Sequence, residues 1–280
     1  MRGSAPSRDR KGAKGRHTSQ NFSTNVLCVL TAALACSSVP AQTSGGTAAV
    51  AIWTPGEAVL ATDSKVTLSG GGAVLPAEQS CKIRTSGRFF YAIAGLYNHA
   101  PTGFDAWRLA EGAIAGATSV NEAASRAERR IQPALEMALA DIRRRDPQDY
   151  ARRYAEVWLA IWIAGTERGD PVMAGREFLP GRTVAREFPG ASGAGAKGEI
   201  GIAIFGERQA IDSSYGDVQA IGRSVEAKGP AAAARALVEL EIAGEPEKAG
   251  GPISMARIRT VRTTTGGAEW IERGLCAGPR

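Results

Sequence analysis

Residues 48–62 read AAVAIWTPGEAVLAT and carry the strongest local signal in the chain. Two apolar runs, 48–53 and 58–62, flank the turn Thr54-Pro55-Gly56-Glu57. Short apolar runs on either side of a Pro-Gly pair predict a β-hairpin. The runs contain almost no polar residue, so both faces of this hairpin are expected to be buried.

The segments that follow alternate between strand and helix patterns. A Gly-rich stretch at 69–72 separates the hairpin from Cys81-Lys82-Ile83, and residues 186–199 are predicted to be a loop. The order of the elements predicts an α+β fold with two sheets faced by helices. The expected strands are 89–94, a second hairpin at 157–178, 200–204, 253–261 and 268–271, and the expected helices are 104–114, 120–145 (with Ser119 and Glu122 as a capping box), 207–222 and 230–243.

The positive charge of the chain is concentrated at its N-terminus. The 280 residues include 34 Lys and Arg and 28 Asp and Glu, a net charge of +6. Residues 1–41 contain six of the cations and one acid, which leaves 28 cations and 27 acids in the remainder. The body of the protein is therefore almost neutral, and its charge does not predict a nucleic-acid partner.

Residues 1–41 have the pattern of a secretory signal peptide. Residues 1–24 are polar and basic, an apolar run covers 26–35, and Val39 and Ala41 are the small residues before a cleavage site. The apolar run is shorter than the ~20 residues that span a bilayer, so no stable membrane insertion is expected. Export to the periplasm or the medium is predicted. The alternatives are lipoprotein processing before Cys36, or a basic tail followed by a buried helix.

Histidine and cysteine are scarce. The chain has two His and four Cys, and beyond residue 41 only His99, Cys81 and Cys276 remain. These are too few for a zinc site of His and Cys, and no metal or cofactor is expected. In an oxidising compartment Cys81 and Cys276 are predicted to form a disulfide; two unpaired buried cysteines are the alternative.

Several short motifs, taken in order, resemble the proteasome β-type family of N-terminal-nucleophile hydrolases. The resemblance runs with gaps from Thr47 to about Ile271. It rests on Gly46-Thr47, Leu60-Ala61-Thr62-Asp63-Ser64-Lys65, Cys81-Lys82-Ile83, Ile93-Ala94-Gly95-Leu96-Tyr97 and Gly250-Gly251-Pro252-Ile253-Ser254. It implies a four-layer αββα sandwich and self-association as a ring or dimer.

The same resemblance implies an active site. Thr47 would be the nucleophile, freed by cleavage of the Gly46–Thr47 bond, so residues 42–46 would be a short propeptide and 47–280 the hydrolase domain. Asp63, sixteen positions after Thr47, and Lys82 would be its partners, and the Gly95 amide would donate to the oxyanion. The implied activity is a threonine-type hydrolase that cleaves peptide or other amide bonds through an acyl-enzyme.

This chemistry also follows from the properties of the groups. A threonine hydroxyl needs a base to take its proton, and a free α-amine, with an ordinary pKa of roughly 7.7–8, can act as that base near neutrality. Lys82 would favour the developing alkoxide, and Asp63 would hold Lys82 in place and keep it protonated. A body with one histidine suits such a mechanism.

The chain departs from the family pattern at two places. The family has a supporting serine after the strand that corresponds to 200–204, where this chain reads Phe205-Gly206-Glu207, and an Asp-x-x-Ser where it reads Pro246-Glu247-Lys248-Ala249. Glu245 or Glu247 could compensate. A catalytically silent scaffold or binding protein, and a small-molecule amidase, are therefore the alternative functions. His99 is expected in a partly exposed loop, with a place in the substrate cleft as the alternative.

Overall fold

The computed structural model describes residues 43–45, 47–70, 73–154, 157–188, 199–260 and 267–276. All of them belong to one compact unit, Val39–Arg280. The predicted signal peptide, residues 1–41, lies outside the described residues, as do Gln42 and Gly46 of the predicted propeptide.

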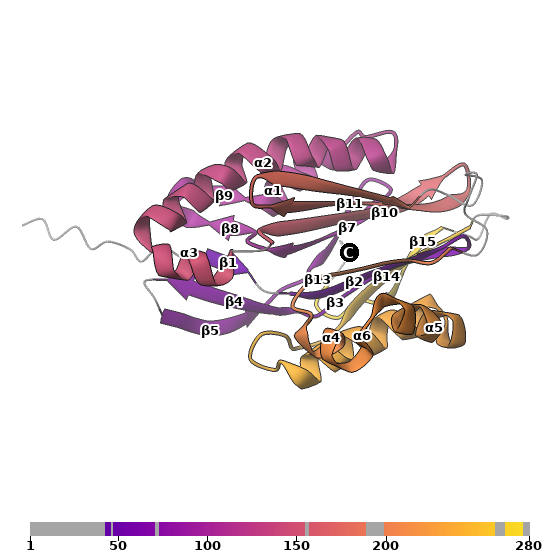
Figure 1. Cartoon of the computed structure of the whole chain (residues 1–280). Helices are drawn as coiled ribbons and strands as arrows, with labels where there is room; N and C mark the ends of the chain where they lie inside the picture. The colour runs from indigo at the N-terminus through magenta and orange to yellow at the C-terminus, as the bar shows by residue number, and fades with distance from the viewer. Residues whose placement is uncertain are drawn as a thin grey trace, which may run out of the picture. The chain divides into compact units, whose positions relative to one another are not determined.

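The predicted hairpin at 48–62 is present as strands β2 and β3, and it lies in the middle of a five-stranded antiparallel sheet (Figure 1). Its register pairs Thr54 with Glu57 beside the turn and Ala49 with Thr62 at the other end. Every residue of 48–53 and 58–62 is buried, as expected. In spatial order the strands are β13 (Gly201–Gly206), β2 (Ala48–Thr54), β3 (Glu57–Thr62), β14 (Ser254–Arg259) and β15 (Ala268–Glu272).

A second five-stranded sheet contains the other predicted hairpin as β10 and β11. In spatial order its strands are β12 (Arg182–Phe188), β11 (Asp170–Leu179), β10 (Leu159–Glu167), β7 (Phe89–Gly95) and β6 (Ile83–Ser86). Strand β12 runs into the predicted loop at 186–199. Its sequence has no apolar run because it is an edge strand, and none of its residues is buried.

A third sheet brings together segments that are distant in the sequence, and it was not predicted. In spatial order its strands are β5 (Ala73–Gln79), β4 (Lys65–Gly70), β1 (Thr43–Gly45), β8 (Asn98–His99) and β9 (Phe104–Asp105). The short strand β1 pairs with β4 on one side, Gly45 opposite Thr67, and with β8 on the other, Thr43 opposite His99. A 3-10 turn, Ala100–Thr102, follows β8.

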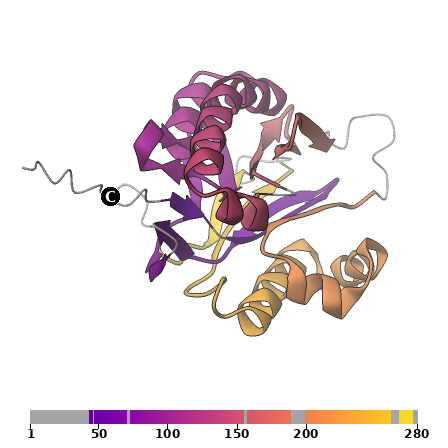
Figure 2. The same ribbon diagram turned by 60° about the vertical axis from the view of Figure 1, so that its left-hand side comes forward.

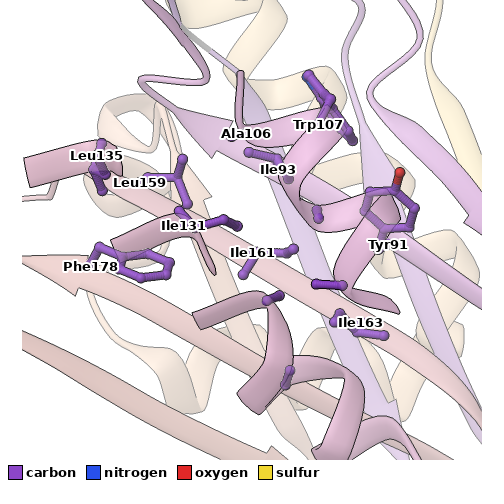
Figure 3. Packing of buried hydrophobic residues seen from close by; sticks show 14 of the residues in the cluster. Tyr91, Ile93, Ala106, Trp107, Ile131, Leu135, Leu159, Ile161, Ile163 and Phe178 are labelled. Atoms are coloured by element: carbon purple, nitrogen blue, oxygen red, sulfur yellow. The ribbon is translucent and has the colours of Figure 1, made fainter. Parts of the chain in front are cut away.

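Two helices pack on the second sheet, α1 (Ala106–Ile114) and α2 (Val120–Arg145), and α3 (Pro147–Arg153) packs against α2. Helix α2 has the predicted bounds, and the Ser119 hydroxyl accepts from the Glu122 amide at its start. Its apolar side meets the sheet in a cluster that includes Ile131 and Leu135 of α2 and Ile161 of β10 (Figure 3). Burying these side chains provides the main stabilisation of this half of the unit.

The alternating residues of β2 explain why its sequence is apolar throughout. Ala49, Ala51 and Trp53 lie in a cluster with residues of the first and second sheets. Val50 and Ile52 lie in another cluster, with the helices α4 (Gln209–Tyr215), α5 (Val218–Lys228) and α6 (Pro230–Gly244). Figures 1 and 2 show α4–α6 and the pair α1 and α2 on opposite sides of the two sheets. The fold is therefore α+β, as predicted.

The helix predicted around 207–222 is instead two helices. Gly216, at φ +71°, ends α4, and the Asp217 carboxylate then accepts from the Ala220 amide at the start of α5. A left-handed glycine followed by an Asp N-cap is a local stop and restart of a helix.

None of the helices in the described ranges is long and apolar enough to cross a membrane.

Candidate active site

Thr47 immediately precedes β2 and is fully buried. Its carbonyl accepts from the Glu207 amide at 2.7 Å. Gly206, which precedes Glu207, has φ +81°, and a Cβ at Gly206 would lie 1.8 Å from the Thr47 carbonyl oxygen. Only glycine fits there, so the end of β13 holds Thr47 through close backbone contact.

Asp63 follows β3 and lies opposite Ala48, since β2 and β3 pair Ala49 with Thr62. Four donors converge on its buried carboxylate. Oδ1 accepts from the Ala48 amide at 3.0 Å and from Lys82 Nζ at 2.8 Å. Oδ2 accepts from the amides of Lys65 at 3.1 Å and Gly250 at 2.9 Å. The carboxylate thus joins the peptide after Thr47 to a buried lysine.

Lys82 comes from the segment before β6 and is 1% exposed. Its ammonium donates to Asp63 and to the Lys65 carbonyl. Burial lowers the pKa of Lys82, and the charge and hydrogen bond of Asp63 only partly oppose that effect. Asp63 thus favours the charged form of Lys82, while desolvation disfavours it.

Gly95 ends β7 with φ +94°, and a Cβ there would lie 2.5 Å from the Trp158 carbonyl oxygen. The Leu96 amide donates to that carbonyl, and Gly95 pairs with Leu159. In this antiparallel pattern the Gly95 amide is directed away from β10. Ala94 lies next to Gly206, since its Cβ is 3.3 Å from where a Gly206 Cβ would be. The end of β7 is therefore close to Thr47.

The predicted disulfide between Cys81 and Cys276 is confirmed, with the two Cα atoms 4.7 Å apart. It connects the residue directly before Lys82 to the C-terminal segment after β15. Cys276 is buried, and its amide donates to the Arg273 carbonyl, which also accepts from the Ser254 hydroxyl. The disulfide thus anchors the segment that carries Lys82 to the start of β14.

The structure brings Asp63 and Lys82 into contact beside Thr47. Glu245, named as a possible compensating residue, has its carboxylate 3.2 Å from Lys248 Nζ. Residues that sequence reasoning missed are Glu207 and Gly250, which contact the site through their backbone amides. In the sequence, Glu207 stands out only through the departure from the family pattern at 205–207, and Gly250 only through the Gly-Gly pair. Neither feature predicted a contact with Thr47 or Asp63.

His99 is not in a partly exposed loop. It is 1% exposed in β8, and its Nε2 lies 3.0 Å from the Asp141 carboxylate of α2. Burial of Asp141 acts to raise its pKa, but hydrogen bonds from His99, Arg144 and Arg145 together outweigh it, so the pKa is lowered. The expectation failed because β8 is too short to be recognised as a strand from its sequence.

In the part of the chain that the structure describes, no group of three or more His, Cys, Asp or Glu side chains could bind a metal ion. A separate open groove of about 490 Å³ lies over α2 and α3, where Leu139, Arg143, Tyr150 and Trp158 are among its lining residues. The Thr47 site is closed by comparison, since Thr47 and Asp63 are inaccessible.

No family model and no curated protein matches the chain. Among solved structures, it is similar to Anbu from Hyphomicrobium sp. strain MC1, with 15% sequence identity and a TM-score of 0.42. That similarity covers 80% of this chain and 87% of the other.

Proposed function

We propose that the protein is an N-terminal threonine hydrolase of the proteasome β-type, folded as a four-layer αββα sandwich, that cleaves peptide or amide bonds through an acyl-enzyme. The observation that carries this proposal is the position of Asp63. One oxygen of its carboxylate accepts from both the Ala48 amide and the Lys82 ammonium, so a buried cation is fixed beside the residue that follows Thr47.

The first step proposed is self-processing. The Thr47 hydroxyl attacks the Gly46 carbonyl carbon, the Gly46–Thr47 amide bond breaks, and the acyl group moves from nitrogen to oxygen. Water then hydrolyses the ester, which releases the propeptide 42–46 and leaves a free α-amine on Thr47. Lys82 favours these steps because its cation stabilises the alkoxide that forms as the hydroxyl loses its proton.

Turnover uses the same groups. The α-amine takes the hydroxyl proton as Thr47 attacks a substrate carbonyl, and the Gly95 amide donates to the oxyanion of the tetrahedral intermediate. The protonated amine then gives its proton to the leaving amine, and water hydrolyses the acyl-enzyme by the reverse sequence of proton transfers. No cofactor has a part in this proposal.

The position of β1 favours a peptide substrate over a small amide. Strand β1 contains Thr43–Gly45 of the propeptide and lies between β4 and β8. Its release would leave the facing edges of both strands without a partner. An extended peptide could then pair with β4 and β8 in its place, since strand addition satisfies backbone groups on both sides.

We further propose that the protein works outside the cytoplasm and self-associates. The Cys81–Cys276 disulfide and the signal-peptide pattern of residues 1–41 support export. Self-association rests on the family resemblance alone, and light scattering on the processed protein tests it: a mass of one chain at micromolar concentration would contradict it.

N-terminal sequencing and intact mass of the full chain, produced with its export signal, test the main proposal. We expect a mature chain that begins at Thr47, and retention of residues 42–46 in Thr47→Ala. Thr43→Ala is the matched control, because it removes another propeptide-region threonine and should be processed normally. A mature wild-type chain that begins at Gln42 would refute the mechanism.

Labelling by an electrophilic amide mimic then separates an enzyme from a silent scaffold. A hydrolase should carry the label on Thr47, and labelling should be absent in Thr47→Ala. A chain that begins at Thr47 but takes no label would favour the scaffold function, for which the departures from the family pattern at 205–207 and 246–249 are the supporting observation.

A further inference from the structure

Glu207 is the charged residue most closely tied to Thr47 by the backbone. Strands β13 and β2 pair Gly206 with Ala48, so the next residue, Glu207, lies opposite Thr47. Its amide donates to the Thr47 carbonyl at 2.7 Å. The glycine requirement at Gly206 fixes this approach, because any Cβ there would collide with Thr47.

The Glu207 carboxylate faces several charged groups. Its Oε2 lies 3.6 Å from Lys248 Nζ, and Lys248 also pairs with Glu245. The Glu207 charge acts on Lys82 and Glu241 as well, raising the pKa of each, and Lys82 is in turn bound to Asp63. The Glu207 side chain is 31% exposed, whereas the Lys82 and Asp63 side chains are buried.

We propose that Glu207 is a positioning residue whose carboxylate holds the α-ammonium that cleavage of the Gly46–Thr47 bond creates. This inference rests on the proposed function. The α-amine becomes an ammonium each time it takes the Thr47 hydroxyl proton, and a carboxylate beside it stabilises that form. Glu207 itself neither gains nor loses a proton in the cycle, and Lys248 limits its effect by partly neutralising it.

Glu207 thus lies where the family resemblance implies a supporting serine. A carboxylate differs from a hydroxyl in one measurable way: its charge raises the pKa of a neighbouring amine. The Thr47 α-amine should therefore be a stronger base, and its neutral form should predominate only at higher pH. Removing the charge should lower the pKa of the amine.

The test is the pKa of the Thr47 α-amine, followed by NMR of ¹³C-threonine in the processed protein. Glu207→Gln should lower it by about 1 unit, and Glu207→Asp should keep it near the wild-type value. Glu245→Gln is the matched control, because it removes the same charge from the same Lys248 cluster and should shift the pKa by less than half as much. The acid limb of kcat/KM should move to lower pH in parallel.

The outcomes separate the two proposals. An α-amine pKa that is the same in Glu207→Gln and wild type, or that moves equally in Glu245→Gln, overturns the role of Glu207 and leaves the hydrolase intact. A wild-type chain that never begins at Thr47 overturns the hydrolase and this role together. Thermal unfolding of each variant shows whether a shift reflects loss of structure, and the Glu207→Asp rescue must hold for the role to stand.

Discussion

Lys82 Nζ lies 2.8 Å from Asp63 Oδ1, and the two side chains are 2% and 0% exposed. They come from different sheets, since Asp63 follows β3 and Lys82 precedes β6. The same Asp63 oxygen accepts from the Ala48 amide. A buried ion pair therefore joins the two sheets beside Thr47. Changing either residue should affect both the stability of the protein and the chemistry at Thr47.

Asp63→Asn should destabilise the protein by about 3–5 kcal/mol, because it leaves a buried ammonium without a counter-charge. The loss should be greater at low pH. The folded-state pKa of Lys82 is lowered, so between that pKa and the ordinary value the unfolded chain binds more protons and stability rises with pH. Urea unfolding at pH 6 and pH 9 measures both effects.

Lys82→Met is the informative companion to that variant. It removes the cation but leaves Asp63 with the amides of Ala48, Lys65 and Gly250. We expect a smaller loss of stability than in Asp63→Asn, together with loss of processing at Thr47. Normal processing in folded Lys82→Met would contradict the role given to Lys82.

The disulfide should contribute strongly to stability. Cys81 and Cys276 are 195 residues apart, and a cross-link of that span destabilises the unfolded chain by about 5 kcal/mol on the chain-entropy model. The double variant Cys81→Ser, Cys276→Ser should lose most of this contribution to the free energy of unfolding, measured by urea unfolding. Thiol titration of the folded, oxidised wild type should find neither cysteine free, and reductant should lower only the wild-type midpoint.

Gly206→Ala should be severely destabilising and should displace Thr47. The new methyl group would lie 1.8 Å from the Thr47 carbonyl oxygen at a residue with φ +81°. Gly222→Ala, within α5, is the matched control: nothing lies within 4 Å of its Cβ position, and it should stabilise by about 0.5–1 kcal/mol. Equal unfolding midpoints for the two variants would contradict the close contact.

Glu241 should make stability depend on pH. It is fully buried in α6 and accepts from the Ala210 and Ile211 amides at the start of α4. Burial raises the pKa of Glu241 in the folded state. Between the ordinary pKa of a glutamate and this raised pKa, the folded chain binds more protons than the unfolded chain. Stability therefore falls as the pH rises through that window.

Two variants of Glu241 separate its charge from its hydrogen bonds. Glu241→Gln should remove this pH dependence and keep the two hydrogen bonds. Glu241→Ala should cost about 1–3 kcal/mol because the two amides lose their acceptor. Thermal unfolding between pH 4 and pH 8 distinguishes the variants, and a pH dependence unchanged in Glu241→Gln would assign it to another group.

The parts of the fold predicted from sequence have local signals. Helix α2 has a Ser cap and a long amphipathic repeat, and the β2–β3 and β10–β11 hairpins join apolar runs through short turns. Strand β12, helix α3 and the small sheet of β1, β4, β5, β8 and β9 were not predicted. None of the residues of β12 and α3 is buried, and β1, β8 and β9 are only two or three residues long, so these elements have no apolar pattern to recognise. Strand β1 joins β4 to β8, which is distant from β4 in the sequence.

The same division holds for the site. The sequence by itself determined the hairpin at 48–62, and the register of that hairpin places Asp63 opposite Ala48, the residue after Thr47. Its cysteine and signal-peptide patterns also predicted the pair Cys81–Cys276. The family resemblance implied that Asp63 holds Lys82. Only the tertiary structure decided that this pair is buried, that the Gly250 amide donates to the same carboxylate, and that the Glu207 amide donates to the Thr47 carbonyl. These contacts join separate sheets and loops, and packing rather than local propensity determines their distances.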